Sequence, residues 1–115
     1  MSKILRIDDQ VININYVVAI RKIENNKIQL FLSSAPFIEY QDNNDTIYRK
    51  IVDIVKSNKK NFLEVSTWAI DFSKVLMIEQ LDNSTKVHIE YSPGLQAIFE
   101  HKDFIPLVLR LQDNI

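Results

Sequence analysis

Hydrophobic positions recur along this chain at a spacing of 58 residues. The window 4–25 contains eleven aliphatic residues, and each has an apolar counterpart in the window 62–83. The polar Asn13 of the first window corresponds to Asp71 of the second. After these windows we expect one inserted residue in a turn, which changes the spacing to 59 and aligns residues 27–30 with 86–89. This agreement indicates an internal repeat.

Each copy of the repeat predicts the same series of strands. Two short apolar segments flank turn-like residues, and a longer segment rich in β-branched and aliphatic residues follows. Val87, Ile89 and Tyr91 alternate with polar residues, which predicts a half-buried strand. The predicted strands are 4–7, 11–14, 17–24, 27–33 and 37–40 in the first copy, and 62–65, 69–72, 75–81, 86–92 and 97–99 in the second.

A helix is expected to close each copy. In the first copy Asp45 is a suitable N-cap, and apolar residues from Ile47 to Val55 fall on one helical face. In the second copy Asp103 can cap a helix over 104–112. The polar segment 57–61 between the copies reads as a short connector.

The size of one copy indicates how the two are arranged. About 55 residues alone bury too little apolar surface for a generous core. We therefore predict an α+β fold in which two tandem β-meander-plus-helix repeats, 3–58 and 62–112, pack with approximate twofold symmetry. The two repeats are expected to form a single domain over residues 1–115.

One shared motif resembles a known family. In each copy an Asn or Asp, Asn13 or Asp71, precedes a Val-x-x-Ile segment, 17–20 or 75–78, and an acidic turn. This pattern resembles the small flagellar-operon proteins of the FlbD kind, which are about one copy long and end in a helix. Those proteins usually place a glycine in the first turn, where this chain has Asp9-Gln10 and Thr67-Trp68. The resemblance implies a small accessory or interaction protein without catalysis.

Composition excludes several classes of site. Gly94 is the only glycine and there is no cysteine. Phosphate-binding loops, dinucleotide fingerprints and nucleophile elbows need glycines at fixed spacing, so the sequence excludes them. Disulfides, zinc ribbons and thiol nucleophiles need cysteine. The turns are built from Asn, Asp, Ser and Pro instead.

The distribution of charge and apolar residues bears on location and partners. The longest apolar runs, such as 104–109, are far shorter than the roughly 20 residues of a membrane span, and we expect a cytoplasmic protein. Residues 1–60 contain ten basic and seven acidic residues, a net charge of +3, whereas residues 61–115 contain four and eight, a net charge of −4. This asymmetry favours docking of one copy on the other, or association between chains.

Aromatic residues are the candidate contact surface. Trp68 falls at a predicted turn, and Tyr16 and Tyr40 fall on faces expected to be partly open. Aromatic rings are favoured anchors of protein interfaces. Alternatively, Trp68 covers the junction between the two copies.

Two further clusters define alternative functions. A basic segment could contact phosphates of a nucleic acid, although aspartates interrupt it. Its members are Arg49, Lys50, Lys56, Lys59 and Lys60. His88 and Glu90 share one strand face, and with His101 they could form a metal-dependent site if their strands are adjacent.

The sequence therefore predicts a non-enzymatic accessory or protein-interaction module. Its partner would be another protein or a second copy in a homodimer, with no cofactor, no metal and no membrane contact. A nucleic-acid-associated protein using residues 49–60 is the first alternative. A small metal-dependent enzyme around His88, Glu90 and His101 is the second.

Overall fold

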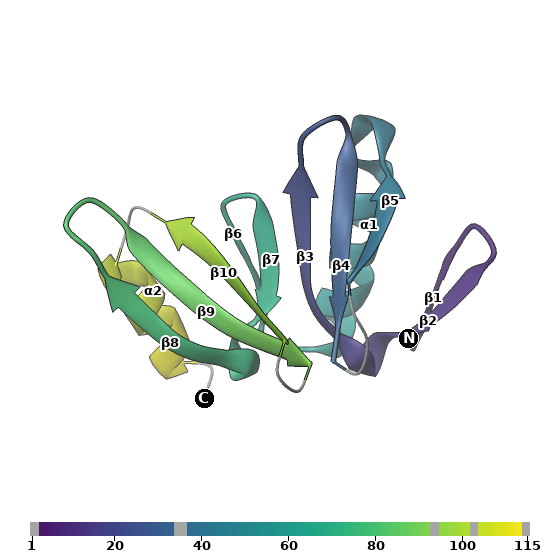
Figure 1. Ribbon diagram of the computed structural model, residues 1–115. Helices are drawn as coiled ribbons and strands as arrows, with labels where there is room; N and C mark the ends of the chain where they lie inside the picture. Colours follow the sequence, from purple (N-terminus) through teal and green to yellow (C-terminus); the bar gives the residue numbers. More distant parts are fainter. Residues whose placement is uncertain (1–2, 34–36, 93–94, 102–103, 114–115) are drawn as a thin grey trace.

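The computed structural model describes residues 3–33, 37–92, 95–101 and 104–113 (Figure 1). In these residues the chain forms a mixed α+β domain in which each of two helices follows a run of five strands. The first part of the chain contains β1 (Ile4–Ile7), β2 (Gln10–Asn13), the 3₁₀ turn η1 (Ile14–Tyr16), β3 (Val17–Ile23), β4 (Lys27–Leu32), β5 (Ile38–Gln41), η2 (Asn43–Asp45) and α1 (Thr46–Asn58). The second part contains β6 (Phe62–Val65), β7 (Trp68–Asp71), η3 (Phe72–Lys74), β8 (Val75–Gln80), β9 (Thr85–Ser92), β10 (Leu95–His101) and α2 (Phe104–Asp113).

Corresponding elements in the two parts share local details. β1, β2, η1 and β3 begin 58 residues before β6, β7, η3 and β8. Asn13 Oδ1 accepts a hydrogen bond from the backbone N of Asn15 at 2.9 Å, and Asp71 Oδ1 accepts one from Ser73 N at 3.0 Å. Each side chain thereby caps a 3₁₀ turn and directs the chain into the next strand. The spacing of 58 therefore relates the elements from β1 to β3 to those from β6 to β8.

The predicted change of spacing to 59 is wrong. β3 pairs with β4 through Ile20 and Leu30, and β8 pairs with β9 through Ile78 and Val87, so β4 and β9 correspond at a spacing of 57. The cause lies in the turns. The β3–β4 turn closes at Ile23 opposite Lys27, whereas in the β8–β9 turn Leu81 N donates to Ser84 O at 2.8 Å. The second turn is therefore one residue shorter.

The strands form three sheets. The largest has the order β5-β4-β3-β7-β6, and the others are β10-β9-β8 and the β1–β2 hairpin. Strand β3 is antiparallel to β7, with Ala19 opposite Ile70, Ile20 opposite Ala69 and Arg21 opposite Trp68. This pairing adds the β6–β7 hairpin of the second part to the sheet of the first.

Apolar side chains form two buried clusters. The first contains the β1–β2 hairpin, the inner face of α1 and parts of β3 and β4; the second contains residues of β3, β6, β7, β9 and α2. Figure 1 shows α1 beside β3–β5 and α2 behind β8 and β9, with β6 and β7 between the two groups. The buried clusters meet where β3 pairs with β7. No helix in the described parts of the chain has the length and apolar character that crossing a bilayer requires.

Helix α1 begins differently from the prediction. Asp42 is buried and accepts from the backbone N of Ile47 and of Tyr48, each at 2.8 Å. Asp45, the predicted N-cap, makes no capping hydrogen bond and has left-handed backbone with φ 58°. The intervening turn η2 lets the carboxylate of Asp42 reach the helix from further back. The predicted cap of the second helix, Asp103, lies outside the described residues.

Candidate functional site

A groove runs along strand β2 of the β1–β2 hairpin. Among the described strands, β2 pairs only with β1. The groove encloses about 570 Å³ and is lined by Gln10, Val11, Ile12, Asn13, Tyr16, Leu32 and Ile38. Val11 is 59 % exposed and Tyr16 is 49 % exposed. An open strand edge and exposed apolar side chains therefore occur together.

Local contacts position the residues that line the groove. The Asn13 cap directs the chain through η1, which places Tyr16 just beyond the last residue of β2. Its carbonyl oxygen accepts from Ser33 N at 2.8 Å, which ties η1 to the end of β4. At the first residue of β2, Gln10, the Oε1 accepts a hydrogen bond from the hydroxyl of Tyr40 on β5. The groove is thus braced by contacts between β2, β4 and β5.

The position of Tyr40 also affects its titration. Desolvation by burial, with a smaller contribution from the negative charge of Asp8, raises the pKa of the Tyr40 phenol above its usual value. The phenol therefore remains protonated at neutral pH and continues to donate to Gln10. Of the predicted contact residues, Tyr16 lines the groove beyond the last residue of β2, and Tyr40 contacts Gln10 at the first residue of that strand.

Trp68 lies elsewhere, at the pairing of β3 with β7. It is only 4 % exposed, and its ring stacks on Phe31 with centroids 5.4 Å apart and an interplanar angle of 21°. The Arg21 guanidinium lies 5.2 Å from the Trp68 ring centroid, a cation–π contact. This burial supports the alternative in which Trp68 covers the junction between the two parts of the chain.

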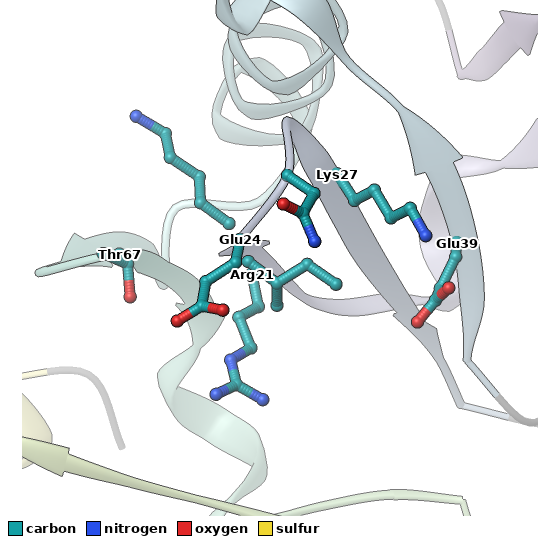
Figure 2. Close-up of a pocket in the computed structure, with 8 residues that line it drawn as sticks. Arg21, Glu24, Lys27, Glu39 and Thr67 are labelled. Carbon is teal, nitrogen blue, oxygen red and sulfur yellow. The ribbon is translucent and has the colours of Figure 1, made fainter.

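A second hollow of about 610 Å³ lies beside the β3–β4 turn. Figure 2 shows Arg21 and Glu24 on one side with Thr67 across from them, and Lys27 extending toward Glu39. Lys22, which also lines this hollow, donates to Asp45 Oδ2 at 3.2 Å. The lining therefore contains side chains of both charges, three basic and two acidic.

The predicted basic segment does not present one continuous face. Arg49 Nη1 lies 2.6 Å from Glu64 Oε1, and Lys50 donates to the carbonyl oxygen of Arg6 at 3.0 Å. The Glu64 hydrogen bond raises the pKa of Arg49. Lys59 turns inward, with a side chain only 17 % exposed, whereas Lys56 and Lys60 are exposed. Three of the five cations are thus engaged by the protein itself.

The predicted histidine cluster is only partly described. His88 Nε2 lies 3.3 Å from Glu79 Oε1 on the neighbouring strand, and Glu90 is exposed. His101 pairs with Thr85 through the backbone of β10 and β9. Within the residues whose placement is described, no three His, Asp or Glu side chains converge as metal ligands.

Sequence reasoning missed most of the groove. Val11, Leu32 and Ile38 look like ordinary core positions in the apolar pattern, because periodicity cannot show that a strand lacks a neighbour. At a spacing of 58, the exposed Val11 corresponds to the buried Ala69, so the shared apolar pattern gave no signal for the groove. Comparisons of the chain with protein-family models, curated proteins and solved structures found no match.

Proposed function

We propose that this protein is a non-enzymatic accessory module that binds another polypeptide through the groove along β2. The observation that carries the proposal is the open edge of β2 beside the exposed side chains of Val11 and Tyr16. An extended segment can add to such an edge by backbone hydrogen bonds, while its alternate side chains enter the adjoining groove. Affinity would come from the backbone and from apolar burial.

The chemistry of the groove also favours binding. Its polar lining consists of the amides of Gln10 and Asn13 and the phenol of Tyr16. These groups donate and accept hydrogen bonds. They suit recognition of a peptide backbone better than acid–base chemistry.

We further propose that the two parts of the chain, 3–58 and 62–112, are copies of one unit packed with approximate twofold symmetry in a single domain. The common order of elements, the spacing of 58 and the Asn13 and Asp71 caps support this. So does the left-handed backbone at both Asp8 and Ser66, which follow β1 and β6.

Photo-cross-linking in the native host tests the proposed function. A photoreactive phenylalanine analogue replaces Tyr16 in one variant and the exposed Glu24 at the β3–β4 turn in a control. We expect a discrete protein adduct from position 16 that is lost when Val11→Lys is added. No protein adduct at position 16, or an identical adduct from both positions, would contradict a binding groove along β2.

A further inference from the structure

Strand β3 pairs with the β6–β7 hairpin, but the corresponding elements, β8 and the β1–β2 hairpin, do not pair with each other among the described strands. Phe62 and Ala69 are buried, 1 % and 0 % exposed, in the cluster that contains the inner face of α1. Their counterparts at a spacing of 58 are Ile4 and Val11, which are 52 % and 59 % exposed. The first hairpin thus presents apolar side chains where the second hairpin buries them.

Strands β3 and β8 differ in burial in the same way. Val18, Ala19 and Ile20 of β3 are fully buried where β7 pairs with this strand. On β8 the corresponding residues are Leu76, which is 53 % exposed, Met77, which is 47 % exposed, and the half-buried Ile78. Among the described strands, β8 pairs only with β9. A strand with apolar residues and an open edge is ready to accept another strand.

We propose that the partner of the β2 groove is a second copy of this chain, whose β8 strand pairs with β2 as β3 pairs with β7 within one chain. This inference rests on the proposed function. The register of β3 with β7, shifted by 58 residues, places Met77 of one copy opposite Ile12 of the other, Ile78 opposite Val11, and Glu79 opposite Gln10. The contact buries Val11 and Met77.

The backbone of both open edges fits this register. Ile14 N donates to Lys3 O in the β1–β2 ladder, and Leu81 N donates to Ser84 O in the β8–β9 ladder. Because hydrogen-bonding direction alternates along an antiparallel strand, the polar groups of Val11 face away from β1 and those of Ile78 face away from β9. Within the chain, Lys22 N donates to Thr67 O, which makes Ile20 and Ala69 a hydrogen-bonded pair. Ile78 and Val11 are the equivalent pair between two copies, so they should be hydrogen-bonded as well.

The positions of the two strands make the contact intermolecular, and their charge is compatible with it. Figure 1 shows β2 and β8 at opposite ends of the molecule, so one chain cannot pair them. The contact joins the half with a net charge of +3, residues 1–60, to the half with a net charge of −4 in a second copy. Complementary charge favours this orientation of the two chains. Two chains that exchange both contacts form a closed dimer, and larger rings follow if the rotation differs.

Engineered disulfides test the register directly, because the chain contains no cysteine. Gln10 and Glu79 would be opposite each other in a non-hydrogen-bonded pair, with Cα atoms about 4.5 Å apart, within disulfide range. Both residues are exposed in the single chain. The Gln10→Cys/Glu79→Cys variant should form interchain disulfides under mild oxidation. The control Gln10→Cys/Glu100→Cys uses an exposed position on β10 and should not.

The mass of the assembly in solution gives the second measurement. By light scattering, wild-type protein should be a dimer or a larger closed assembly, and Val11→Lys and Met77→Lys should each reduce it to monomer with unchanged circular dichroism. The control Ile98→Lys replaces an apolar residue that is 51 % exposed on β10 and should leave the mass unchanged. A monomeric wild type at high micromolar concentration, or equal cross-linking of both cysteine pairs, would overturn the proposal.

The two proposals fail separately. If the protein is monomeric but the photoreactive group at position 16 still captures a different protein, the groove binds a partner other than a second copy and only the pairing of β2 with β8 is wrong. If the protein is monomeric and position 16 captures nothing, the proposed function fails as well.

Discussion

The ammonium group of Lys59 lies 3.3 Å from the Oδ2 of Asp71 and 2.7 Å from the carbonyl oxygen of Val17. Lys59 follows α1, Val17 begins β3 and Asp71 ends β7, so one cation links the two parts of the chain. The side chains of Lys59 and Asp71 are 17 % and 8 % exposed. Asp71 also accepts from the backbone N and the hydroxyl of Ser73. This carboxylate therefore combines a local cap with a long-range ion pair.

Replacing Asp71 should destabilise the protein more than replacing its counterpart Asn13. Asp71→Ala leaves a partly buried ammonium group without its counter-ion and removes a cap, and we expect a loss of about 2–4 kcal/mol in the free energy of unfolding. Asn13 is exposed and only caps η1, so Asn13→Ala should cost about 0.5–1 kcal/mol. Urea denaturation of the two variants measures the difference. Equal losses would show that the Lys59 contact adds nothing to the cap.

Trp68 is expected to contribute to stability through packing at the junction. Trp68→Ala removes the stacking on Phe31 and leaves a cavity where β3 meets β7, so the free energy of unfolding should fall by about 3–5 kcal/mol. Tyr16→Ala, at a side chain that is 49 % exposed, should change it by less than about 0.5 kcal/mol. Thermal unfolding followed by circular dichroism compares them. A small loss for Trp68→Ala together with weakened partner binding would instead make the indole a contact residue.

The local elements could be predicted from the sequence because each depends on neighbouring residues. Alternation over β9 and the apolar face of α1 are set by short-range periodicity. The 3₁₀ turns η1 and η3 were not predicted, and their first residues, Ile14 and Phe72, fall in predicted strands. The α+β class follows from those elements. The Val17–Ile20 segment and its counterpart at residues 75–78 both form strands for the same reason.

The pairing of β3 with β7 could not be predicted in the same way. Val18, Ala19 and Ile20 carry the same apolar pattern as Leu76, Met77 and Ile78, yet the first set is buried and most of the second set is exposed. Which strand gains a neighbour depends on long-range placement and not on its own residues. The groove along β2 has the same origin, since it exists because no described strand covers Val11.

The N-terminus of α1 provides a test of capping at a distance. Asp42→Ala leaves the backbone N–H groups of Ile47 and Tyr48 without their carboxylate acceptor, so we expect a loss of about 1–3 kcal/mol in the free energy of unfolding. Asp45→Gly relieves left-handed backbone at φ 58° and removes an exposed ion pair with Lys22, two effects of about 1 kcal/mol or less that oppose each other. Urea denaturation should therefore show a clear loss only for Asp42→Ala. A larger loss for Asp45→Gly than for Asp42→Ala would instead identify Asp45 as the cap of α1.

Tyr48 should make stability depend on pH in the alkaline range. Burial, with the charge of Glu64, raises the pKa of Tyr48 from its ordinary value of 10.0 to about 12, although Arg49 opposes the shift. Because the unfolded chain loses this proton at lower pH than the folded protein does, the stabilising effect is complete below pH 10 and is lost as pH rises through about 12. Tyr48→Phe keeps the ring and should flatten this decline in urea denaturation between these pH values, leaving the smaller effect of Tyr40. Phenolate absorbance should show one late ionisation that disappears in the variant, and its persistence would assign the late step to another tyrosine.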